Sequence, residues 1–131
     1  MTVTAAANIA AVSPHRMIWV TFQRAGFHRW PDAPQERDYL ATRHRHLFKF
    51  RVWIQVWHRD REVEFHTFLE WLESLYKDSI LQLDGKSCET ISDELHDHIA
   101  AKYADREIWI EVSEDGECGN LSRYSAKEPR A

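Results

Sequence analysis

An alternating stretch over residues 44–57 constrains the fold more than any other feature of the chain. Side chains of a β-strand point alternately to opposite faces, and β-branched and aromatic residues favour strands. The pattern therefore predicts one long strand with a histidine pair at its entry and an apolar row behind it. The residues on this face are His44, His46, Phe48, Phe50, Val52, Ile54 and Val56.

His44 and His46 are placed to share one metal ion, because side chains two residues apart in a strand lie on the same face. Zinc, which histidine nitrogens bind at about 2.0–2.1 Å, is the usual metal of a histidine-rich catalytic site. A single His-x-His pair also occurs as a surface patch in a basic turn. A third histidine is therefore needed before the spacing favours a metal site.

The rest of the chain predicts three more strands and two helices. The strands cover residues 17–23, 108–114 and 121–124, and the helices cover residues 64–77 and the segment capped by Thr90. Residues 31–42 form a long loop, and residues 81–87, with the Asp84-Gly85 turn signal, form a connector. The order ββααββ predicts an α+β domain with a four-stranded antiparallel sheet and both helices on one face.

Length and composition indicate a single domain. A chain of 131 residues with 44% hydrophobic residues can bury a sizeable core, which we place at residues 15–124 between flexible tails at 1–14 and 125–131. The net charge of −4 provides no basic field for nucleic acid. No apolar run approaches the roughly 18 residues of a membrane span. Cys88 and Cys118 are too few for a disulfide scaffold, so we expect a cytoplasmic protein with reduced thiols.

Trp53 and Trp57 fall on the face of the long strand that points away from the core. Large aromatic side chains on a solvent face are unusual, and exposed apolar patches often mark contacts between proteins. A four-stranded sheet also has open edges that can pair with another chain. We therefore expect a cyclic homo-oligomer.

Short motifs along the chain occur in an order that is typical of a known family. They are A-G-F-H-R-W at residues 25–30, H-R-H at 44–46, E-V-E-F at 62–65 and the strand at 108–114 that ends in Glu114. Over residues 19–124 the chain resembles the 6-pyruvoyl-tetrahydropterin synthase and 6-carboxytetrahydropterin synthase family, which has the tunnelling fold. The resemblance implies that fold, with chains that assemble into a barrel as trimers or dimers of trimers.

The resemblance also implies roles for individual residues. Three histidines bind zinc in that family, and they correspond to His28, His44 and His46. The family's terminal glutamate, which anchors the guanidine-like edge of a pterin, corresponds to Glu114, where a carboxylate can accept two hydrogen bonds. Without the resemblance, Glu114 would be interpreted as a solvated strand end. The implied cofactor is Zn2+ and the implied ligand is a pterin or another purine-derived small molecule.

The chain departs from the family pattern where the proton relay is expected. The family's cysteine base corresponds to Leu40, and of its Asp-His pair only Asp78 remains, followed by Ser79. Because this chain lacks both the cysteine and the histidine, the family's usual mechanism cannot run in it. Substitute bases can come from the loop that precedes the long strand, where solvation is the simpler explanation of each polar side chain. The candidates there are Glu36, Asp38 and Tyr39.

Three functions stay open from the sequence. The first is a zinc-dependent lyase acting on a pterin or purine-derived substrate, with the metal as Lewis acid. The second is a binding protein that keeps the metal and captures a nucleobase-like ligand without converting it, which the loss of the relay favours. The third is a protein that binds no metal at these histidines and acts through its surface.

Overall fold

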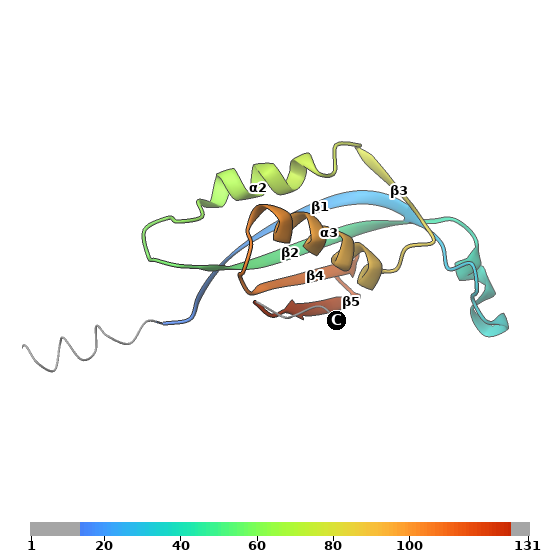
Figure 1. Cartoon of the computed structure of the whole chain (residues 1–131). Coiled ribbons are helices and arrows are strands. Elements are labelled where there is room, and N and C mark those ends of the chain that lie inside the picture. Colours follow the sequence, from blue (N-terminus) through green and yellow to red (C-terminus); the bar gives the residue numbers. More distant parts are fainter. Residues whose placement is uncertain (1–13, 127–131) are drawn as a thin grey trace, which may run out of the picture.

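The computed structural model describes residues 14–126 of the chain. In order, its elements are β1 (Arg16–His28), the 3-10 helix η1 (Gln35–Ala41), β2 (His44–Val56), α2 (Phe65–Ser74), β3 (Ile80–Asp84), α3 (Cys88–Lys102), β4 (Ile108–Glu114) and β5 (Cys118–Tyr124) (Figure 1). The predicted α+β class is confirmed. The tails expected over residues 1–14 and 125–131 fall almost wholly outside the described residues.

One mixed sheet of five strands, in the order β3-β1-β2-β4-β5, forms the body of the molecule. β1 pairs antiparallel with β2, β2 with β4, and β4 with β5, whereas β3 pairs parallel with β1. The predicted four-stranded antiparallel sheet and the order ββααββ are therefore wrong. Residues 81–87 were expected to be a connector, but Leu81 and Leu83 are buried beside β1 and make this segment an edge strand.

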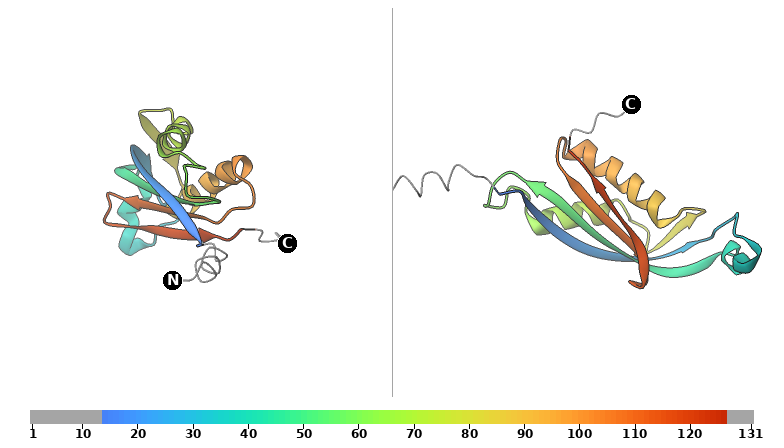
Figure 2. Two further views of the ribbon diagram at one scale, coloured as in Figure 1. Left: turned by 90° about the vertical axis from the view of Figure 1, so that its left-hand side faces the viewer. Right: turned by 90° about the horizontal axis from the view of Figure 1, so that it is seen from below.

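The helices α2 and α3 cover the same face of the sheet, as predicted (Figure 2). Phe48, Phe50, Val52, Ile54 and Val56, on the predicted core face of β2, are all buried. They share one core cluster with Phe68 and Leu72 from α2 and with Ile91, Leu95 and Ile99 from α3. The alternation in β2 and the helical spacing in α2 and α3 thus serve the same core.

Both helices begin with a side-chain cap. Glu64 accepts hydrogen bonds from the backbone N–H groups of His66 and Thr67, which have no partner inside α2. Ser87 accepts the N–H of Thr90, so α3 begins at Cys88 and the prediction of Thr90 as the cap is wrong by three residues. This earlier start brings the first turn of α3 close to the end of β1.

The sheet face opposite the helices carries a row of tryptophans. Trp19 lies opposite Trp53 across β1 and β2, and Trp53 lies opposite Trp109 across β2 and β4. Trp19 is 54% exposed, and the guanidinium of Arg51 lies 5.1 Å from the centroid of its ring. Neither helix covers this aromatic row in the described chain. Within residues 14–126, no helix has the length and apolar character needed to cross a membrane.

Candidate metal centre

Three histidines meet where β1 ends and β2 begins. In the pairing of these strands His28 lies opposite His44, and His46 lies opposite Gly26. All three side chains continue the alternation that places Phe48 in the core, so they lie on the helix-covered face. A Cβ at position 26 would come within 3.1 Å of the Phe48 ring. Glycine at this position therefore allows close packing beneath the histidines.

The three imidazole rings approach one another edge to face. Their centroids are 4.7 Å apart for His28 and His44, 5.1 Å for His28 and His46, and 5.0 Å for His44 and His46. One ring nitrogen from each lies within 4.8 Å of the other two, so the group could hold a metal ion. The structure thus brings together the three histidines that the sequence analysis singled out.

Each histidine uses Nδ1 for a hydrogen bond to an oxygen atom. A carbonyl or carboxylate oxygen can only accept a hydrogen bond, so Nδ1 carries the proton in a neutral ring and Nε2 keeps its lone pair. Metal-binding histidines in proteins are oriented by such bonds from the second ring nitrogen. The partners are Lys86 O at 3.1 Å for His28, Thr42 O at 2.8 Å for His44, and Asp115 Oδ2 at 2.7 Å for His46.

His28 is the most enclosed of the three, with 7% of its surface exposed. Its Nε2 is buried and makes no hydrogen bond within the described chain. Oε2 of Glu114 lies 3.1 Å from this nitrogen, which brings a negative charge close without forming a hydrogen bond. A buried ring nitrogen without a partner costs free energy, and a bound cation would remove that cost. The donor set and this unpartnered atom both fit a metal ion.

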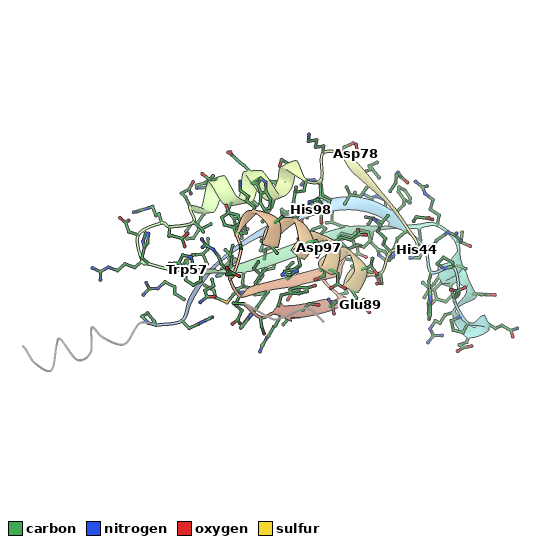
Figure 3. The ribbon with its side chains drawn as sticks, viewed as in Figure 1. His44, Trp57, Asp78, Glu89, Asp97 and His98 are labelled. Carbon is green, nitrogen blue, oxygen red and sulfur yellow. The ribbon has the colours of Figure 1, made fainter. Side chains whose placement is uncertain are left out.

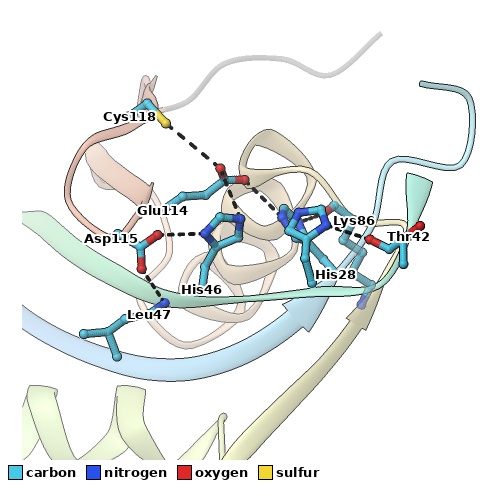
Figure 4. Close-up of polar contacts among 9 residues, drawn as sticks. His28, Thr42, His46, Leu47, Lys86, Glu114, Asp115 and Cys118 are labelled. Carbon is cyan, nitrogen blue, oxygen red and sulfur yellow. Dashed lines mark hydrogen bonds and ion pairs between the residues drawn. The ribbon is translucent and has the colours of Figure 1, made fainter. Parts of the chain in front are cut away.

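Glu114 stands at the end of β4 beside the histidines, where it lies opposite Phe48. Its Oε1 is 3.6 Å from Nε2 of His46, and Figure 4 shows the carboxylate between the rings of His46 and His28. Glu114 follows Ile108, Ile110 and Val112 on one face of this strand and is half-buried there. A ligand bound at this position would meet the histidines and a carboxylate together.

A cavity of about 500 Å³ opens beside this group, and its lining includes His28, His44 and Glu114. Leu40 lines the cavity as well, so the position at which the resemblance implies a cysteine base presents an apolar side chain to the cavity. Two thiols also reach the wall. Burial raises the pKa of the Cys88 thiol to about 12, whereas Cys118 is exposed and its Sγ lies 4.0 Å from Oε1 of Glu114.

The three carboxylates named as catalytic candidates do not join the histidines. Glu36 and Asp38 are exposed on η1 and do not line the cavity, although Leu40 of the same helix does. Asp78 is exposed between α2 and β3, away from His44 (Figure 3). It borders a separate depression formed with β3 and α3. Their catalytic roles stay predictions.

Two residues near the site were missed from the sequence, namely Asp115 and Cys118. Asp115 belongs to an Asp-Gly pair, which is typical of a turn, yet its carboxylate contacts His46. Hydrogen bonds from the Leu47 N–H and then from His46 hold the pKa of Asp115 below its ordinary value, so it is a carboxylate at neutral pH. The signal available in the sequence was its position directly after Glu114.

The fold and the site together define an α+β protein with a three-histidine group at one end of its sheet, beside a carboxylate and a cavity. Comparison of the chain with protein-family models gives no match, and comparison with curated proteins gives none either.

Proposed function

We propose that this protein is a zinc-binding protein like the 6-pyruvoyl- and 6-carboxytetrahydropterin synthases, acting on a pterin or another purine-derived small molecule by lyase-type chemistry. One observation carries the proposal. His28, His44 and His46 each have Nδ1 bonded to an oxygen, and one nitrogen of each ring lies within 4.8 Å of the others. Three imidazoles that each present Nε2 are the ligand set of an open, catalytic zinc site.

Zinc is the metal that this donor set favours. Imidazole ligands suit zinc, copper, iron and nickel, whereas calcium and magnesium prefer oxygen ligands. Among these metals zinc is the usual partner of three histidines in hydrolytic and lyase sites. Bound there, the metal would supply Lewis-acid polarisation of a substrate oxygen.

Glu114 is the proposed anchor for the amino-pyrimidinone edge of the ligand. Its two carboxylate oxygens can accept a pair of parallel N–H donors, an arrangement that is short and charge-assisted. The adjoining cavity of about 500 Å³ lies within the range of small-molecule sites, roughly 300–1,000 Å³. These features support a bicyclic ligand that reaches the zinc from the Glu114 side.

A second candidate is a binding protein that captures the same class of ligand without converting it. The observation that favours it is Leu40, which lines the cavity where the resemblance places a catalytic cysteine. General-base help is worth about 10²–10⁴-fold in rate, so an enzyme without it would be slow. Binding requires only the metal, Glu114 and the cavity.

Assembly into a homo-oligomer, as a trimer or a dimer of trimers, is part of the proposal. The tryptophan row on the open face and the two edge strands β3 and β5 support it. A barrel closed by pairing of these edges would enclose that face.

The test has two parts. Metal analysis of the purified protein should give close to one zinc per chain. Incubation of the zinc-loaded protein with dihydroneopterin triphosphate, followed by chromatography, should then yield a new pterin product. Binding of neopterin without any product supports the second candidate. Failure to retain zinc, together with no thermal shift on addition of neopterin or guanine, contradicts both.

A further inference from the structure

We propose that Asp115 is a positioning residue of the metal centre, whose carboxylate fixes His46 in the tautomer that presents Nε2 to the cation. The inference rests on the proposed metal-binding function, and it concerns a residue that the resemblance does not mark. Three hydrogen bonds tie Asp115 to the start of β2.

Asp115 is fixed from its backbone and from its side chain. Its N–H donates to Leu47 O at 2.8 Å, and Oδ1 accepts the Leu47 N–H at 2.8 Å. Oδ2 lies 2.7 Å from Nδ1 of His46 (Figure 4). The residue has φ of +60°, in the left-handed region that aspartate and asparagine tolerate better than most residues. The carboxylate therefore has little freedom to turn away from the ring.

Among the three histidines, only His46 has an Nδ1 that is hydrogen-bonded to the side chain of another residue. Nδ1 of His28 and of His44 lies against the backbone carbonyls of Lys86 and Thr42. A charged carboxylate is a stronger acceptor than a neutral carbonyl, so it makes the His46 ring the better electron donor at Nε2. A substitution of Asp115 consequently changes the hydrogen-bond acceptor at Nδ1 of His46 directly.

The two contacts of the carboxylate explain why this position suits aspartate and not asparagine. Leu47 N–H and His46 Nδ1–H both need an acceptor, and the two oxygens of Asp115 serve one each. An asparagine offers one oxygen and one NH2 group. If its oxygen stays on Leu47, the NH2 group faces the ring and favours the tautomer with the proton on Nε2, the nitrogen that must bind the metal.

The chain sequence places the two carboxylates on opposite sides of one ring. Glu114 Oε1 lies 3.6 Å from Nε2 of His46, and the next residue, Asp115, contacts Nδ1. The turn that begins at Asp115 uses the positive φ values of Asp115 and of Gly116, which are +60° and +73°. The last residue of β4 thus supplies the carboxylate beside the metal position, and the first residue of the turn supplies the carboxylate behind the ligand.

The first experiment reads the tautomer in metal-free protein. Long-range 1H–15N spectra of histidine-labelled protein are recorded about two pH units above the ordinary imidazole pKa of about 6.5, where neutral rings dominate. The wild type should show His46 protonated on Nδ1, and Asp115→Asn should show it protonated on Nε2. The proposal is overturned if wild-type His46 carries its proton on Nε2, or if the variant leaves the tautomer unchanged.

The second experiment measures zinc affinity by competition with a chromophoric chelator. Loss of a hydrogen-bond partner of a metal-binding histidine typically weakens affinity by about 10–100-fold, and we expect that range for Asp115→Asn. Asp84→Asn is the matched control, since Asp84 also has a positive φ, of +49°, and its carboxylate contacts Arg29 at an exposed position. Its affinity should equal that of the wild type.

The outcomes separate this inference from the proposed function. An Asp115→Asn affinity within twofold of the wild type overturns the role of Asp115 while leaving the zinc site in place. A wild-type protein that binds no zinc contradicts the proposed function, and the tautomer spectra still decide whether Asp115 controls His46. If the variant does not fold, the wild-type spectrum alone can contradict the proposal.

Discussion

His28 lies directly opposite His44 in the pairing of β1 with β2, and the centroids of their rings are 4.7 Å apart. One candidate metal ligand thus comes from each strand, and His46, two residues along β2, adds a third from the same face. Ligands carried on paired strands are held more rigidly than ligands on loops, which is the requirement for a preorganised metal site.

The first prediction concerns the metal. The double variant His44→Ala/His46→Ala removes two of three ligands, so its zinc content should fall from close to one per chain to near zero. His98→Ala, which removes an exposed histidine on α3, should leave the content unchanged. Elemental analysis after gel filtration gives the measurement. Equal zinc in the double variant and the wild type would place the metal elsewhere.

The second prediction tests the ligand anchor. Neopterin should raise the melting temperature of the wild type, because a ligand at 100 times its Kd stabilises the native state by about 2.7 kcal/mol. Glu114→Gln replaces one acceptor by a donor and should abolish the shift. Glu111→Gln lies on the same strand but the opposite face and should retain it. A shift that survives Glu114→Gln shows that another residue holds the ligand.

The third prediction compares two phenylalanines of α2. Phe68 is fully buried, whereas Phe65, three residues earlier on the same helix, is 56% exposed. Phe68→Ala should lower the free energy of unfolding by about 3–5 kcal/mol, the usual cost of removing a buried ring. Phe65→Ala should change it by no more than about 0.5 kcal/mol. Chemical denaturation of both variants checks the difference, and similar losses would contradict the burial of Phe68.

The fourth prediction concerns acid stability. Nη1 and Nη2 of Arg106 donate to the two carboxylate oxygens of Glu62, at 2.7 and 2.8 Å, and this pair holds the pKa of Glu62 below its ordinary value. A carboxyl group with a lowered pKa stabilises the fold above its unfolded pKa of about 4.3, and the contribution disappears as the pH falls through the folded pKa.

Glu62→Gln should therefore lose about 1.5–3 kcal/mol of stability at neutral pH, the range for hydrogen bonds to charged groups. The difference from the wild type should shrink below about pH 4, because the wild-type carboxyl is then protonated as well. Urea denaturation across pH measures this, with the exposed Glu70→Gln as control. A pH-independent difference would mean that the charge of Glu62 is not involved.

The fifth prediction concerns assembly. Light scattering should give a mass that is a multiple of the 15.5 kDa chain, with three or six chains expected. Trp19→Glu places a charge on the open sheet face and should lower that mass. Phe65→Glu, at a similarly exposed position on the helix side, should not. A monomeric wild type contradicts the proposed barrel.

The parts of the fold that the sequence predicted are those with strong periodicity. The alternation of β2 and the apolar spacing of α3 each follow from one buried face, so the residues themselves report it. β3 was not predicted because it has only five residues and runs into the Asp84-Gly85 turn signal. Its alternation is too short to distinguish an edge strand from a connector. Its parallel pairing with β1 depends on how the chain returns after α2, which local sequence does not encode.

The residues of the candidate site also differ in whether the sequence could predict them. His44 and His46 share a strand face by spacing alone, and the position of Glu114 at the end of an apolar row was also visible in the sequence. The contact of Asp115 with His46 spans 69 positions and depends on the pairing of β2 with β4. No local pattern could distinguish its carboxylate from that of an ordinary turn.

With the proposed zinc site, the pairing of β1 with β2 also makes metal binding a measure of correct folding. If either strand slipped by a single position, its side chains would exchange faces, and its histidines would point toward the tryptophan side. Such a misaligned hairpin could still be compact and rich in β-structure, yet it could not gather three imidazoles. Zinc uptake during refolding would therefore count the molecules whose strands have closed in register, which spectroscopic measures of secondary structure cannot do.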